Sequence, residues 1–97
     1  MTKPAWDVCA GQPEFRAASG ASAPDRTSPV AVGDFIRLST MRGRCIVIVE
    51  VLNVVRATAR YTGAVIGLSE ASTAGLRYGD HVEFRWRNVF EVTRTGA

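Results

Sequence analysis

The sequence predicts an all-β fold: a small five-stranded barrel of the SH3-like or OB-like kind with one helical turn. The first observation is the run from Cys45 to Val55, in which almost every residue is apolar and most are β-branched. Such side chains pack well on a pleated surface, so the run predicts one long central strand. The second observation is a set of short alternating segments separated by turn residues. The expected strands fall within residues 30–38, 45–55, 60–67, 78–86 and 89–93.

Residues 1–29 differ in composition from the rest of the chain. They contain all four prolines and a stretch rich in Ser, Gly and Ala. This composition predicts a flexible, disordered N-terminal tail, followed by the barrel domain over residues 30–97. Trp6 and Phe15 are isolated aromatic residues in this tail, either incidental or part of a docking segment that orders on a partner. Removal of the tail is expected to leave the domain folded.

Glycines mark the expected turns and bends. Two segments read Gly-Asp-x-apolar-x-apolar, beginning at Gly33 and Gly79. Glycine readily takes positive φ and aspartate bonds its own downstream backbone, so each segment predicts a turn that leads into a strand. Gly63, inside the third expected strand, predicts a bulge or sharp bend. The helical turn is expected at residues 69–74, with Ser69 as its N-cap.

The charge of the chain is modestly positive and is carried by arginine. The net charge is +3, and Lys3 is the only lysine. Residues 30–97 hold nine arginines against six acidic residues, so the whole excess lies there. Guanidinium groups are planar, forked donors suited to phosphate or carboxylate. The excess is nevertheless smaller than a dedicated nucleic-acid-binding domain usually shows.

The sequence predicts neither catalysis nor a metal site. His81, the only histidine, shares a strand face with Glu83 and Arg85. A catalytic histidine needs an oriented partner and a substrate pocket, and no phosphate-binding loop, HExxH motif or nucleophile elbow is present. Cys9, Cys45 and His81 are too far apart in sequence to form a recognisable metal signature. We therefore expect a non-enzymatic protein without a cofactor.

The N-terminus lacks the continuous apolar stretch of a signal peptide. A disulfide between the two cysteines is not expected, in keeping with a reducing compartment. The sequence predicts a cytoplasmic protein without membrane contact that is a monomer or weak homodimer.

Candidate binding residues occur at turns that are expected to flank one mouth of the barrel (Arg42, Arg44, Arg77 and Tyr78) and near the end of the fourth expected strand (Arg85 and Arg87). Small barrels bind protein partners through a loop face or a strand edge. The leading prediction is therefore an interaction or regulatory module that binds a protein partner. The alternative is RNA or single-strand binding, because arginine beside an aromatic ring can clamp phosphate and stack a base. Trp86 follows the phase of Val82 and Phe84, which favours a core position. The candidates are Arg42, Arg44, Arg77, Tyr78, Arg85 and Arg87.

The order of these features resembles the YegJ-like domains, a bacterial family of small barrels of unknown function. The matching stretches are residues 49–51, 61–63, 79–84 and 88–90. The match covers residues 32–93, but Ile48 replaces the family's tryptophan and no Asn-x-Pro follows the third strand. This resemblance implies a barrel and no agreed activity. Gly33 and Asp34 followed by residues 49–51 are also similar to PUA-like barrels, a resemblance that implies RNA binding.

Overall fold

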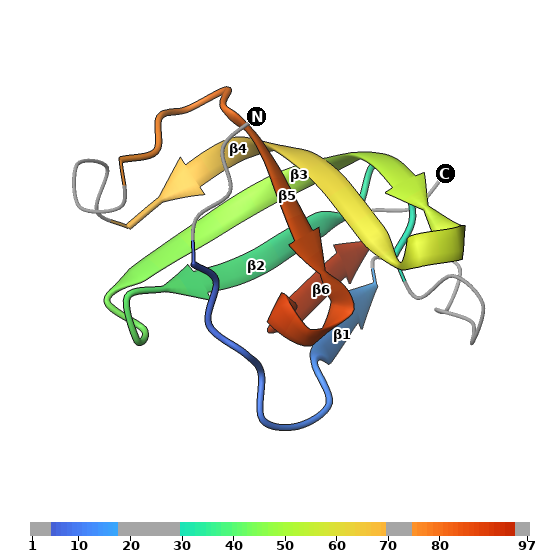
Figure 1. The fold of residues 1–97 in the computed structure, drawn as a ribbon, viewed down its shortest axis with the longest axis horizontal. Helices are drawn as coiled ribbons and strands as arrows, with labels where there is room; N and C mark the ends of the chain where they lie inside the picture. The colour runs from blue at the N-terminus through green and yellow to red at the C-terminus, as the bar shows by residue number, and fades with distance from the viewer. Residues whose placement is uncertain (1–4, 18–29, 70–74, 95–97) are drawn as a thin grey trace.

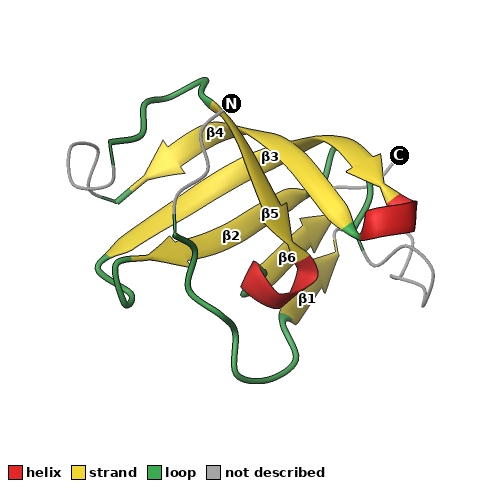
Figure 2. Cartoon of the chain, viewed as in Figure 1, coloured by secondary structure: helices red, strands yellow, loops and turns green. Residues whose placement is uncertain are grey.

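The computed structural model describes residues 5–17, 30–69 and 75–94. These residues form one six-stranded sheet in the order β1-β6-β2-β3-β4-β5, and the sheet curls around a core (Figure 1). The all-β prediction is confirmed, whereas the strand count is six and not five because the N-terminal region adds β1. Figure 2 shows the strands with their two one-turn 3-10 helices. The elements are β1 (Glu14–Ala17), β2 (Phe35–Thr40), β3 (Cys45–Val55), η1 (Arg56–Thr58), β4 (Arg60–Leu68), β5 (His81–Arg85), η2 (Trp86–Asn88) and β6 (Glu91–Arg94).

Strand β3 has the bounds that its β-branched run predicts. It lies between β2 and β4 and pairs with both in antiparallel register. Alternate side chains point into the core and are fully buried, namely Cys45, Val47, Val49 and Val51. On the opposite face Ile46, Ile48 and Glu50 are half-buried and Leu52 is exposed. The fully buried face of this strand is therefore the one that carries Cys45 and the three valines.

The core is made of inward-pointing side chains from five strands and three connections. Three half-buried aromatic residues, Trp6, Phe15 and Trp86, pack against it. Trp86 thus lies on the core side, as its phase favours, although η2 leaves part of it accessible. The buried residues are Val30, Ile36, Leu38, Cys45, Val47, Val49, Val51, Tyr61, Val65, Leu76, Val82, Phe84, Val89 and Val92.

A bulge lies next to Gly63, as the sequence predicts, but the extra residue belongs to β3. Gly63 pairs with Val51, and the register shifts between Val51 and Asn53, so that Leu52 has no counterpart in β4. A Cβ atom on Gly63 would lie 2.7 Å from the carbonyl oxygen of Glu50. Glycine is therefore required here by the close approach of the two backbones.

The two Gly-Asp segments form the same turn. Both glycines have positive φ, 93° in the first turn and 87° in the second. The Asp34 carboxylate accepts a hydrogen bond from the amide of Ala31 at 2.8 Å, and the Asp80 carboxylate accepts one from the amide of Arg77 at 2.9 Å. From the sequence, these aspartates were expected to bond downstream backbone. They bond the amide three residues upstream because the turn folds back on itself before the strand begins.

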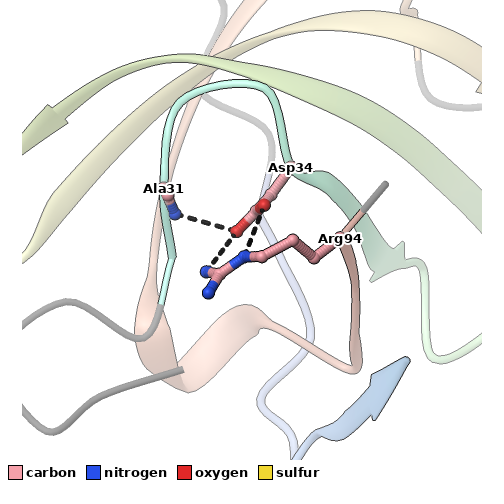
Figure 3. A network of polar contacts seen from close by, with 3 residues as sticks. All are labelled: Ala31, Asp34 and Arg94. Carbon is pink, nitrogen blue, oxygen red and sulfur yellow. Dashed lines mark hydrogen bonds and ion pairs between the residues drawn. The ribbon is translucent and has the colours of Figure 1, made fainter. Parts of the chain in front are cut away.

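Asp34 is also joined to the end of the chain (Figure 3). Arg94 in β6 donates from Nε to Oδ1 at 3.0 Å and from Nη2 to Oδ2 at 2.8 Å. The ring of Phe15 in β1 faces the same guanidinium, and the central carbon of this guanidinium lies 5.3 Å from the ring centroid. This cluster ties the entrance of β2 to β6 and β1.

The prediction of a flexible tail is wrong for residues 5–17. β1 extends the sheet by pairing in parallel with β6. Trp6 and Phe15 pack against this chain's own core, so they are neither incidental nor free for a partner. Burial of two aromatic side chains explains why this part of the chain is ordered despite its prolines. Residues 1–4 and 18–29 lie outside the described part.

Residues 5–9 form a segment that we call the N-terminal strap. Trp6 forms an antiparallel bridge with Thr40, at the end of β2. The amide of Cys9 donates to the carbonyl of Arg87 in η2 at 2.8 Å. The strap therefore connects β2 to the segment that follows β5.

The expected helical turn at residues 69–74 falls mostly outside the described residues. The hydroxyl of Ser69, its expected N-cap, accepts a hydrogen bond from the amide of Ile46 at 2.8 Å. The two described helical turns, η1 and η2, occur where the sequence predicted a turn and a break in strand periodicity.

Candidate partner-binding site

A cavity of about 340 Å³ lies between the N-terminal strap and the end of β5. We call it the Trp6 cavity. Trp6 lines one side, and the other side includes Glu83, Arg85, Arg87 and Asn88. Both Arg85 and Arg87 are candidates from the sequence, and the structure brings them to the same cavity.

Trp6 is held in place by one hydrogen bond from its side chain and by another to the backbone just before it. The indole Nε1 donates to the carbonyl oxygen of Glu83 in β5 at 2.8 Å. The preceding carbonyl, of Ala5, accepts a hydrogen bond from the Thr40 hydroxyl at 2.9 Å. These contacts fix one wall of the cavity before any partner arrives.

Asn88 fixes the opposite wall. It is buried, with 7% of its surface exposed. Its Oδ1 accepts a hydrogen bond from the amide of Arg85 at 3.0 Å, and its Nδ2 donates to the carbonyl of Asp7 at 3.3 Å. The side chain thus shapes the η2 turn and holds it against the strap.

Asp7 fastens the strap to the β2–β3 hairpin. Its carboxylate accepts hydrogen bonds from the Ser39 hydroxyl at 2.8 Å and from the amides of Gly43 at 2.8 Å and Arg42 at 3.1 Å. Burial raises the pKa of the Asp7 carboxyl, but these hydrogen bonds and the charge of Arg42 outweigh it and lower the pKa below its ordinary value of 3.8. The carboxylate is therefore the stable form at neutral pH.

Arg85, which lines the cavity, has a second arginine opposite it in the sheet. Arg60 in β4 lies directly opposite Arg85 in the antiparallel ladder, so both side chains project from the same face. Arg60, Arg85 and Arg87 are all exposed. Across the residues that the structure describes, none of the three forms an ion pair. Glu83 is the acidic residue of the lining.

The remaining sequence candidates lie elsewhere. Arg42 and Arg44 are exposed in the β2–β3 hairpin, which touches the strap through Asp7. Arg77 and Tyr78 precede β5, whereas Arg85 and Arg87 lie at its other end (Figure 1). Arg85 and Arg87 are therefore not joined at the cavity by Arg77 and Tyr78. β5 separates them from the cavity.

Neither Trp6 nor Asn88, which line the cavity, nor Arg60, which lies opposite Arg85, was predicted from the sequence as a binding residue. The strap brings Trp6 to residue 83, across 77 positions of sequence. The approach of Arg60 to Arg85 depends on the register of β4 against β5. Trp6 had a visible signal, an isolated bulky aromatic residue in an otherwise polar segment.

Comparisons with protein-family models, curated proteins and solved structures give no match. The resemblance to YegJ-like and PUA-like barrels stays a prediction, and function has to be argued from the site. Neither Cys9 nor Cys45 forms a disulfide. No helix among the described residues is long and apolar enough to span a membrane.

Proposed function

We propose that the protein is a non-enzymatic interaction module that binds an acidic segment of a protein partner at the Trp6 cavity. The observation that carries this proposal is that Arg85 and Arg87 both line the cavity, with Arg60 directly opposite Arg85 in the neighbouring strand. Like charges directly opposite each other in a ladder are destabilising, and a bound carboxylate offsets that repulsion. A guanidinium also matches a carboxylate in shape and hydrogen-bonding geometry.

The form of the cavity supports binding of a short segment. Its volume of about 340 Å³ is near the lower end of ordinary ligand pockets. Trp6 and Asn88 are already held by hydrogen bonds, so binding requires little further ordering of the protein. The His81 side chain has no hydrogen-bond partner among the described residues, which disfavours acid–base catalysis.

The barrel type belongs to the same proposal. The strand order β6-β2-β3-β4-β5, with the one-turn helix η2 just before β6, favours the SH3-like alternative over the OB-like one. In this arrangement the loops and the strap, and not the sheet interior, are the surfaces open to a partner.

RNA or single-strand binding is the second candidate, and one turn favours it. Tyr78 is 64% exposed and follows the exposed Arg77, so an aromatic ring and a cation share one surface. However, Trp6 and Trp86 pack against the core, and Tyr78 lies at the end of β5 away from Arg85. The residues that could stack on a base and those that could contact phosphate therefore lie in two separate places. For this reason a protein partner is the first candidate.

The test uses fluorescence anisotropy with a labelled hexaglutamate peptide, and a hexaglutamine peptide as the neutral comparison. The double variant Arg85→Ala/Arg87→Ala is expected to weaken hexaglutamate binding about tenfold, because it removes two charged donors at the rim. Arg77→Ala is the matched control, since it removes an exposed arginine at the other end of β5. It is expected to change the affinity by at most about twofold.

Two results would contradict the proposal. One is failure of the wild-type protein to prefer hexaglutamate over hexaglutamine. The other is equal weakening by Arg77→Ala, which would indicate attraction by overall charge alone. Tight binding of an oligouridine that falls steeply with salt and is lost in Tyr78→Ala would instead establish the nucleic-acid alternative.

A further inference from the structure

The two Gly-Asp turns, residues 31–34 and 77–80, match position by position. In each, the aspartate amide donates to the carbonyl three residues earlier, at 3.0 Å in the first turn and 3.1 Å in the second. In each, the glycine amide donates to a carbonyl of the neighbouring strand, at 2.9 and 2.8 Å. The second residue of each turn, Val32 or Tyr78, is 64% exposed. The chain therefore presents the same carboxylate geometry twice.

The first turn shows which group a carboxylate in this position can bind. The Asp34 carboxylate accepts its own turn amide and still receives two parallel hydrogen bonds from the Arg94 guanidinium (Figure 3). The two side chains are 4% and 12% exposed. Phe15 adds an aromatic face on the guanidinium. Forked pairing of this kind is selective for arginine over lysine.

The second turn has the same carboxylate without a guanidinium. Asp80 accepts the amide of Arg77 through Oδ2 at 2.9 Å. No other donor among the described residues reaches the Asp80 carboxylate, and this residue is partly exposed. An aromatic side chain, Tyr78, stands exposed on the same turn.

We propose that Asp80 receives an arginine guanidinium from a protein partner, in the way that Asp34 receives Arg94. The charges nearby set its strength. Arg77 occupies the position that Ala31 has in the first turn, and its positive charge opposes an incoming guanidinium. The exposed ring of Tyr78 favours a cation near its face. This site is separate from the Trp6 cavity and takes the opposite charge.

The experiment is an NMR titration of amide signals with N-acetyl-arginine amide, and N-acetyl-lysine amide as the comparison. Saturable shifts are expected at residues 77–81 for the arginine compound, with clearly weaker binding of the lysine compound. Asp80→Asn keeps an oxygen that can accept the Arg77 amide but removes the charge, so binding is expected to weaken about tenfold or more. Arg77→Ala makes the second turn like the first and is expected to strengthen binding about twofold or more.

Absence of saturable shifts at residues 77–81 would overturn the proposal, as would unchanged binding in Asp80→Asn or equal binding of the lysine compound. Hydrogen exchange at the Arg77 amide verifies that the turn persists in Asp80→Asn.

Dilution of the protein without a probe then shows whether the guanidinium comes from a second copy of this chain or from a different protein. Shifts at the same amides that depend on protein concentration and vanish in Asp80→Asn assign the guanidinium to a second copy of this chain; their absence assigns it to a different protein. The probes differ, and the deciding variant is Asp80→Asn here but Arg85→Ala/Arg87→Ala in the hexaglutamate test, so either proposal can fail alone.

Discussion

Single residues control how closely the strands of this sheet approach. At Gly63 the missing side chain lets β3 and β4 come together, because a Cβ would lie 2.7 Å from the Glu50 carbonyl oxygen and 3.2 Å from the Val49 side chain. The contact is largely with backbone, which cannot move aside without disturbing the ladder. Asp34 acts at the same scale, since its buried carboxylate would be unpaired without Arg94.

Gly63→Ala is expected to lower the free energy of unfolding by about 1–3 kcal/mol through overpacking between β3 and β4. Urea denaturation measures this change. Gly11→Ala is the matched control, because a Cβ there would have no neighbour within 4 Å. It should alter stability by no more than about 0.5 kcal/mol. Similar effects of the two substitutions would show that the contact at Gly63 is not limiting.

Among the elements, the N-terminal strap depends most on polar contacts. It adds only an isolated bridge to β2. Apart from the packing of Trp6 against the core, its other attachments are hydrogen bonds made by Trp6, Asp7 and Cys9. Asp7 makes the largest number of these. Its carboxylate therefore links the position of the strap, and with it one wall of the cavity, to pH.

Acidification is expected to loosen the strap. The folded-state pKa of Asp7 lies below 3.8, so its stabilising contribution is full above that value and is lost as pH falls through the folded-state pKa. NMR signals of the Gly43 amide and the Trp6 indole, followed from about pH 6 to about pH 2, monitor the release.

Asp7→Asn is the control for this titration. It should be less stable than the wild type at neutral pH by about 1 kcal/mol, because the charged acceptor is lost. The Gly43 signal of this variant should no longer respond in the same pH range. An identical response in both proteins would assign the transition to another group.

In the whole molecule, the strands do not pair all the way round the barrel, and the strap and β1 cover the gap that remains. β1 and β5 are the two edges of the sheet and do not pair with each other. The strap crosses between β2 and η2, and β1 covers β6. Full closure by strand pairing, which the sequence led us to expect, is thus replaced by closure with an irregular segment. Exposed strand edges promote self-association, so this segment also protects the sheet.

Deletion of residues 1–29 is accordingly expected to destabilise the domain, contrary to the expectation from composition. Loss of Trp6 and Phe15 uncovers part of the core and should cost about 3 kcal/mol or more. Thermal unfolding measures this loss, and light scattering detects association through the uncovered edges of β2 and β6. The full-length double variant Trp6→Ala/Phe15→Ala should reproduce most of the destabilisation without uncovering the strand edges. A truncated protein as stable as the full chain would contradict the role assigned to this segment.

The sequence by itself determined the features that depend on neighbouring residues. The bounds of β3, the inward phase of its alternate side chains and the two Gly-Asp turns all follow from local patterns of branching, alternation and turn chemistry. Only the tertiary structure decided which distant segments meet. Trp6 reaches Glu83 across 77 positions and Arg94 reaches Asp34 across 60, and the opposition of Arg60 to Arg85 requires the register between β4 and β5. Such contacts depend on how the whole sheet curls and on which surfaces remain to be covered, and a local pattern does not encode either.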